Sequence, residues 1–344
     1  MKSIQPITFS SLLKAKSGPT LIWSNNNGEN IQKLARGIGF VKNSPEKLHD
    51  ELCQMNIAAL KCKGVSAKNR LLAGYLFMRA SQHKAIDGKT LQTLCMANDT
   101  VNKTRELLYH GRGNVSTDLN ITQESSRRTV FSRSVESEFA QSTAFGAAIA
   151  ARAGAGNCGE HAELSTALHA SKLLLEEVLL RVGGIDVDHE WSVLCLPDGN
   201  RIVIDAWAEG SAVMAEDSNF SRDVLNYETI LCLELNSGIA FAKEVQAVLD
   251  ELKKDPNVER HLQACIISKK DNPYEIWLPT SVVSDRFIEK FRTSVQQRAR
   301  KSVKSQLLNE IIAIGVGRSL GANINQAKKF SHNELNSTHF PRNT

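Results

Sequence analysis

Residues 156–160 read Gly-Asn-Cys-Gly-Glu, and this stretch predicts the start of a helix with a cysteine in its first turn. Asn157 is a favourable N-cap residue, and Glu160 follows it at the spacing of a capping box. Unpaired N–H groups and the positive end of the helix dipole stabilise a thiolate at such a position. The flanking glycines keep bulk away from the sulfur of Cys158, so a substrate can approach it.

Two strand-like segments downstream carry the partners that a catalytic cysteine needs. Residues 187–196 (VDHEWSVLCL) and 201–207 (RIVIDAW) show period-two patterning on either side of a Pro-Asp-Gly-Asn turn signal. His189 can act as the base that deprotonates Cys158, and Asp205 can orient the imidazole ring. We therefore predict a Cys158–His189–Asp205 catalytic triad.

The spacing of His189 and Asp205 also makes a prediction about the connection between the two strands. A tight two-residue Asp198-Gly199 turn, which this dipeptide favours, places the two side chains on opposite faces of the sheet. Pairing centred on Pro197 places both on one face. The triad requires a longer loop, a bulge or a shifted strand start, and we predict the longer loop.

Three more residues are expected to support the triad. The backbone N–H of Cys158 supplies one donor to the oxyanion of an acyl-transfer intermediate. Asn157 and the indole of Trp191 are the candidates for the second donor. Trp207 is expected beside Asp205, where its ring shields the hydrogen bond of the carboxylate from water.

In order and spacing, these segments resemble the core of the transglutaminase-like superfamily, which includes peptide N-glycanases and many bacterial transglutaminase-like proteins. Papain-like cysteine proteases are more distantly similar. The resemblance covers about residues 150–210. It implies acyl transfer, in which the thiolate attacks a carboxamide carbonyl and ammonia or an amine leaves. Arg152 stands where papain relatives carry a glutamine, and the zinc-binding CxxC pairs of eukaryotic glycanases are absent, which argues against glycanase activity itself.

The periodicity of the whole chain predicts an α+β protein, and the resemblance implies a transglutaminase-like or papain-like cysteine fold with helical additions at both ends. We divide it into a helical N-terminal region with a loosely ordered start (1–135), a catalytic core (136–280) and a helical, basic C-terminal region with a frayed tail (281–344). Within these regions, 158–180 is expected to be one helix, and 262–268 and 274–278 are expected to be strands.

Composition bounds the class of protein. The 344 residues include 42 basic and 37 acidic side chains, a net charge of +5, and 42% are hydrophobic, which is ordinary for a globular protein and excludes collagen and wholly disordered chains. Seven cysteines without a CxxC pair argue against a disulfide framework and a structural zinc site. Cys158-x-x-His161 lacks a second ligand pair, so we expect no metal and no cofactor.

The N-terminus lacks the apolar core of a secretory signal peptide, and no apolar run approaches the ~18 residues that a membrane helix needs. We therefore expect no transmembrane segment. The expected location is the cytoplasm, or a host cell that the chain reaches by export without a conventional signal peptide.

Residues 286–304 hold seven basic residues and one acidic residue, which gives 7 − 1 = +6. Phe287, Phe291 and Val295 recur at helical spacing, so the segment is typical of an amphipathic basic helix. The simplest interpretation is a solvated face over a core. The alternative is contact with an acidic partner or anionic lipid, and nucleic acid is the least favoured partner because no RNA-binding motif is present.

The resulting functional hypothesis is a cysteine-dependent deamidase or transglutaminase that acts on a glutamine or similar amide of a protein substrate. The large helical flanks are interpreted as substrate-recognition elements, which suits a secreted bacterial effector or toxin. Two alternatives stay open. One is a cysteine peptidase with the same triad, and the other is a non-catalytic binding module that uses the basic helix 286–304.

Overall fold

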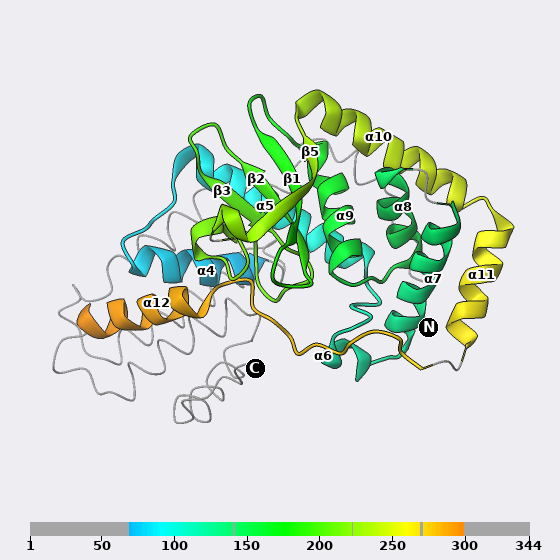
Figure 1. The fold of residues 1–344 in the computed structure, drawn as a ribbon. Helices are drawn as coiled ribbons and strands as arrows, with labels where there is room; N and C mark the ends of the chain where they lie inside the picture. The colour runs from blue at the N-terminus through cyan, green and yellow to red at the C-terminus, as the bar shows by residue number, and fades with distance from the viewer. Residues whose placement is uncertain (1–68, 140–141, 222, 269–270, 299–344) are drawn as a thin grey trace. The chain divides into compact units, whose positions relative to one another are not determined.

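The computed structural model describes residues 69–139, 142–221, 223–268 and 271–298. They form helices and a five-stranded antiparallel sheet, so the chain is an α+β protein (Figure 1). The described residues fall into two compact units. Met96–Glu216 and Phe220–Thr280 belong to the first, and the residues up to Cys95, Asp217–Asn219 and those from Ser281 onward belong to the second. The three-part division made from the sequence stays a prediction.

The sheet of the first unit has the strand order β4-β3-β2-β1-β5, with every neighbouring pair antiparallel. Most residues of β2 and β3 are buried, whereas the edge strand β5 exposes four of its seven side chains. The strands are β1 (Val178–Gly184), β2 (Glu190–Cys195), β3 (Arg201–Ile204), β4 (Val213–Met214) and β5 (Tyr227–Leu233).

Strands β2 and β3 pair in a register that places Ser192 opposite Ile204, and residues 196–200 connect them. The predicted longer loop is therefore confirmed. In this register, an odd-numbered residue of β2 always lies opposite an odd-numbered residue of β3, and directly opposed side chains lie on the same face of the sheet. The odd-numbered residues of the two strands therefore share one face. His189, just before β2, and Asp205, just after β3, consequently lie on the same side.

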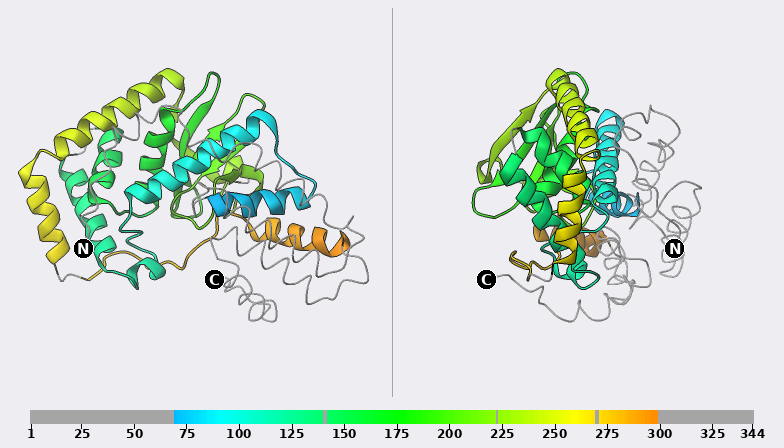
Figure 2. Two further views of the ribbon diagram at one scale, coloured as in Figure 1. Left: turned by 180° about the vertical axis from the view of Figure 1, so that it is seen from behind. Right: turned by 90° about the vertical axis from the view of Figure 1, so that its right-hand side faces the viewer.

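The helices of the first unit follow one another outward from the sheet (Figure 1). Helix α9 (Cys158–Ala170) packs on β1 and β2, α8 (Thr143–Ala153) packs on α9, and α7 (Glu124–Phe139) packs on α8. Helix α11 (Pro256–Ile267) lies against α7, and α10 (Leu235–Leu252) crosses α8 and α9, as seen from behind in Figure 2. Helix α9 is therefore enclosed between sheet and helices.

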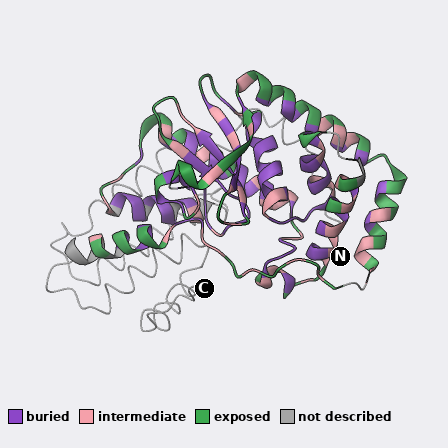
Figure 3. Ribbon diagram, in the orientation of Figure 1, coloured by how far each residue is buried: buried purple, intermediate pink, exposed green. Residues whose placement is uncertain are grey.

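The enclosure of α9 explains its sequence. Every residue from Glu160 to Ala170 is buried, and Figure 3 shows this helix purple while the outer sides of α10 and α11 are green. Small residues dominate the facing helix α8, which ends at Gly154 with φ 71°, a conformation that glycine adopts without strain. The short turn after Gly154 leads to Asn157, and Cys158 follows as the first residue of α9.

The predicted helix over 158–180 is wrong in its second half. Helix α9 ends at Ala170, and the chain enters the sheet as β1 from Val178. The leucine-rich run 173–180 is compatible with the periodicity of a helix and with that of a strand. Its second half forms β1 because it hydrogen-bonds to β2 on one side and to β5 on the other.

The strand predictions at 262–268 and 274–278 are also wrong. Residues 262–267 lie in α11, whose start is marked by the N-cap Asp255 and by Pro256 at the first helical position. Residues 274–278 form no strand, and Trp277 makes an isolated bridge with Val115. For residues 262–268, the helix-capping signal at Asp255 and Pro256 predicts the structure better than the local apolar pattern does.

The second unit contains α4 (Asn69–Ser81) and α12 (Asp285–Arg298). The rings of Tyr75 and Phe287 lie 5.6 Å apart, and Phe287 and Phe291 are buried. The predicted amphipathic helix is confirmed over 285–298, whereas 299–304 lies outside the described residues. Within the part of the chain that the structure describes, no helix is long and apolar enough to cross a membrane.

Two further helices lead to the site. Helix α5 (Gly88–Leu107) carries Arg105 in its last turn, and the four-residue α6 (Ser116–Leu119) carries Asp118. Short 3-10 turns occur at Ala215–Asp217 and Val224–Asn226.

Gly238 provides a test of the packing between α10 and α9. A Cβ atom at Gly238 would stand 2.7 Å from the carbonyl oxygen of Ala170, which belongs to the backbone and cannot move cheaply. We expect Gly238→Ala to lower the free energy of unfolding by about 1–3 kcal/mol in urea denaturation. Gly159→Ala is the control, because its Cβ would meet nothing closer than 3.7 Å. An equal loss in both variants would contradict this packing.

Candidate active site

Cys158 is the first residue of α9 and is partly buried. The preceding Asn157 has the extended conformation of an N-cap residue, and its N–H donates to Glu160 Oε2 at 2.7 Å. Glu160 therefore caps the helix. The N–H groups of Cys158 and Gly159, in the first turn, have no carbonyl partner within the helix, so they are available to an anion.

His189 and Asp205 form a buried pair. Their side chains are 2% and 1% exposed, and His189 Nε2 lies 2.7 Å from Asp205 Oδ2. The other carboxylate oxygen, Oδ1, accepts the N–H groups of Trp207 and Ala208, each at 3.0 Å. Because an ionised carboxylate only accepts, Nε2 carries the proton in this bond, which leaves Nδ1 to exchange a proton with another group.

The pair holds the imidazole ring in its charged form. Burial lowers the pKa of His189, but the Asp205 carboxylate, its hydrogen bond and the nearby Cys158 together raise that pKa to about 10. Burial raises the pKa of Asp205, yet the charge of His189, the hydrogen bonds and the charge of Arg105 hold that pKa below its usual value.

Nδ1 of His189 is buried with no oxygen or nitrogen partner among the described residues, and Cys158 is the neighbouring group that raises the pKa of His189 through a hydrogen bond and through its charge. Burial lowers the pKa of Arg133, but its hydrogen bond to Glu160 and the charge of Glu160 raise that pKa, and Cys158 makes a smaller contribution in the same direction. Arg133, on α7, donates to Glu160 Oε1 at 2.7 Å and lies 4.8 Å above the ring of Tyr274. Cys158 thus begins a helix whose first turn is tied to Arg133 through Glu160.

Aromatic rings enclose the His189 side chain. Ring centroids of Trp191, Trp207 and Phe220 lie 5.4, 4.9 and 4.3 Å from the imidazole centroid. Trp191 and Trp207 are buried. The rings exclude water from the His189–Asp205 hydrogen bond, and interactions between charges are stronger in such surroundings.

The two indole N–H groups near the site already have acceptors. Trp191 Nε1 donates to Ser221 Oγ, and Trp207 Nε1 donates to Asn114 Oδ1 at 3.1 Å. An oxyanion role for Trp191 would require its bond to Ser221 to break. The N–H groups at the start of α9 need no such rearrangement.

Contacts of Arg181 with two carboxyl groups fix α9 against the start of β2. Arg181 of β1 lies 2.7 Å from Glu163 of α9 and 2.7 Å from Glu190, the residue after His189. Burial raises the pKa of Glu163 to about 8, although Arg181 opposes this effect. These contacts tie the helix that bears the sulfur to the strand that bears the imidazole.

Other titratable groups near the site have structural roles. Nδ1 of His161 lies 2.7 Å from the Asn157 carbonyl oxygen, and burial lowers the pKa of His161 to about 4. Among the described residues, no three His, Cys, Asp or Glu side chains are arranged to hold a metal ion. A cavity of about 470 Å³ lies between α7 and α11, and no triad residue lines it.

Sequence patterns did not point to Arg105, Arg133 or Phe220. They lie 53 and 25 residues before Cys158 and 31 residues after His189, so only the folded chain brings them to the site. The triad residues, by contrast, carry local signals of their own: a helix cap, a strand start and a strand end.

No protein-family model, curated protein or solved structure matches this chain.

Proposed function

We propose that this protein is a cysteine-dependent acyltransferase or hydrolase that uses Cys158, His189 and Asp205 on a carboxamide substrate. One observation carries the proposal. A partly buried cysteine begins a helix and interacts with a buried histidine whose Nε2 is held by a carboxylate and whose Nδ1 has no oxygen or nitrogen partner among the described residues. Such a nucleophile–base–orienting group arrangement suits acyl transfer.

In the proposed reaction, His189 holds the proton taken from Cys158, and the sulfur attacks the carbonyl carbon of the amide. A C–S bond forms, and the first-turn N–H groups of α9 bind the oxyanion. The C–N bond then breaks, and the imidazolium gives its proton to the departing ammonia or amine. Water or a primary amine attacks the thioester, gives its proton to His189, and expels the Cys158 thiolate.

We also propose a transglutaminase-like fold for this core. Support comes from the order of the elements: the cysteine begins a helix packed on an antiparallel sheet, the histidine precedes β2, and the aspartate follows β3, the next strand along the chain. This order is the one that the sequence resemblance implies.

Deamidation or transglutamination of a protein glutamine is our preferred reaction. The proposed substrate is a protein, and a role as a secreted effector or toxin inside a host cell is part of the same proposal. It rests on the resemblance and on the large helical flanks. Contact of the basic segment 286–304 with an acidic partner or anionic lipid is also proposed.

The test is mass spectrometry of a tryptic peptide pool incubated with the full-length protein, with and without methylamine. Deamidation adds about 1 Da to a glutamine peptide, and transglutamination adds methylamine at the same residue in place of ammonia. Alkylation of the intact protein by iodoacetamide should modify Cys158 before the exposed Cys232, although Cys158 is less accessible.

The outcomes separate the candidate functions. Cleaved peptides that depend on Cys158 would identify a peptidase. Unmodified peptides, together with alkylation of Cys158 no faster than that of Cys232, would exclude the enzyme and favour a binding module.

A further inference from the structure

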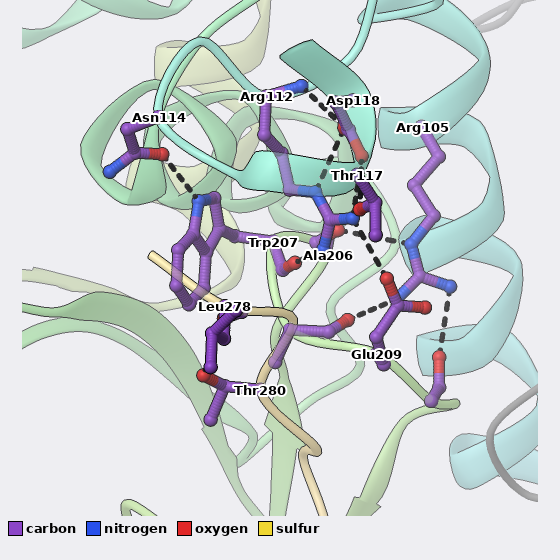
Figure 4. Close-up of polar contacts among 12 residues, drawn as sticks. Arg105, Arg112, Asn114, Thr117, Asp118, Ala206, Trp207, Glu209, Leu278 and Thr280 are labelled. Atoms are coloured by element: carbon purple, nitrogen blue, oxygen red, sulfur yellow. Dashed lines mark hydrogen bonds and ion pairs between the residues drawn. The ribbon is translucent and has the colours of Figure 1, made fainter. Parts of the chain in front are cut away.

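Two guanidinium groups hold the segment that follows Asp205 (Figure 4). Arg105, at the end of α5, donates to three of its carbonyl oxygens: Nε to Ala206 at 3.0 Å, Nη2 to Ala208 at 2.6 Å and Nη1 to Gly210 at 2.9 Å. The guanidinium presents its donors in a rigid planar fork, and the compact ammonium of lysine does not reproduce that geometry.

Arg112 holds a further carbonyl of this segment, that of Trp207. Its Nη1 donates to Trp207 O at 2.8 Å, and its Nη2 contacts Glu209 Oε1 at 2.8 Å. Asp118 of α6 fixes the same guanidinium through Nε at 3.0 Å and Nη2 at 2.8 Å, and also accepts the Arg112 backbone N–H. Arg112 is buried, and Asp118 raises its pKa against the effect of burial.

The held carbonyls belong to the same peptide groups that bind Asp205. The Ala206–Trp207 peptide accepts from Arg105 through its oxygen and donates to Asp205 Oδ1 through its nitrogen. The Trp207–Ala208 peptide accepts from Arg112 and donates to the same oxygen. Each arginine therefore orients and polarises one of the two N–H groups that fix the carboxylate.

We infer that Arg105 and Arg112 are positioning residues for the proposed triad, which they serve through two peptide groups that set the orientation and charge of Asp205. The inference rests on the proposed function. The two oxygens of Asp205 have separate partners, so a rotated carboxylate would lose the His189 hydrogen bond. By keeping Oδ1 on the two N–H groups, the arginines keep Oδ2 on Nε2 of His189.

The local chain is shaped around this arrangement. Gly111 has φ 89°, and a Cβ atom there would lie 2.7 Å from Asp118 Oδ2. A side chain at position 111 would therefore displace the carboxylate that holds Arg112. Glu209 N–H donates to Thr280 O at 2.7 Å, and Trp207 Nε1 donates to Asn114 Oδ1. The segment is thus fixed from several sides, with the arginines acting on the two peptides next to Asp205.

The test replaces each arginine by lysine, which keeps the positive charge and loses the fork. The measurement is the titration of ¹³C-labelled His189 by NMR in the full chain carrying Cys158→Ala, so that it requires no substrate. A loosened Asp205 supports the imidazolium less well, so the midpoint should fall by about one pH unit in Arg105→Lys and in Arg112→Lys. With Cys158 present, kcat should fall by roughly 10²-fold while KM changes little.

Arg128→Lys is the matched control. Arg128 also donates to a backbone carbonyl, Ala153 O at 2.8 Å, and pairs with Glu124, but it has no link to Asp205. Its replacement should leave the His189 midpoint unchanged. If an arginine variant fails to fold, Asp118→Asn weakens the hold on Arg112 while keeping the Arg112–Trp207 bond, and a smaller fall in the midpoint is expected.

A His189 midpoint that stays at the wild-type value in folded Arg105→Lys and Arg112→Lys, with only the melting temperature reduced, would overturn the inference and leave a purely structural role. This result is distinct from failure of the proposed function. If the proposed function fails, the wild-type protein will turn over no amide, whatever the His189 titration shows.

Discussion

Replacing Cys158 with alanine should abolish amide turnover, with a loss of roughly 10⁴-fold or more. A thioester requires the sulfur of Cys158, and neither His189 nor Asp205 can take its place. The buried pair stays intact in this variant, so His189 and the oxyanion donors would remain to assist a slow attack by water.

The measurement is the rate of glutamine deamidation in a peptide pool, followed by mass spectrometry. Cys232→Ala is the matched control, because Cys232 is an exposed cysteine of β5 outside the site, and its removal should leave the rate unchanged. Unfolding in urea should show similar stability for both variants. Full turnover by Cys158→Ala would rule out the cysteine mechanism.

The parts of this site that could be predicted are those with local signals. A capping pattern set the start of α9 at Cys158, and the parity of His189 and Asp205 required a longer β2–β3 connection, which is present. Both inferences use the geometry of one or two adjacent elements, which a short stretch of sequence specifies.

The parts that could not be predicted depend on contacts between distant segments. The run 173–180 carries no period that separates helix from strand, and its pairing with β2 and β5 makes its second half β1. Arg105 reaches carbonyls about a hundred residues further along the chain, and Arg133 reaches Glu160 from another helix. Arginines are common on helix surfaces, so their sequence positions do not reveal such roles.

The second large effect is expected from Asp205→Asn, and it follows from the separate partners of the two carboxylate oxygens. Asn has a single oxygen, and the N–H groups of Trp207 and Ala208 require an acceptor at the position of Oδ1. Its NH₂ group is then directed at Nε2 of His189, so that the imidazole must accept there and carry its proton on Nδ1. That tautomer cannot accept a proton from Cys158, and we expect turnover to fall by roughly 10⁴-fold.

The same substitution should change the dependence of stability on pH. His189 has a folded pKa of about 10, above its unfolded value near 6.5, so its contribution is complete below about pH 6.5 and is lost as pH rises through about 10. Asp205 has a lowered pKa, so its contribution is present above about pH 4 and is lost as pH falls through the folded value. The wild-type advantage in unfolding free energy should therefore be largest between about pH 4 and 6.5.

Urea denaturation of wild type and Asp205→Asn across pH 4–11 measures this advantage, which we expect to reach roughly 1–3 kcal/mol at its maximum. Asp99→Asn is the control, since Asp99 pairs with Lys172 while about half exposed, and screening by solvent makes that pair weak. A difference that stays flat from pH 6 to 10 would mean that His189 does not gain its charge from Asp205. A group other than Asp205 would then have to orient the imidazole ring. In the present structure, the hydrogen bond between Asp205 and Nε2 orients the ring and leaves Nδ1 to exchange a proton with Cys158.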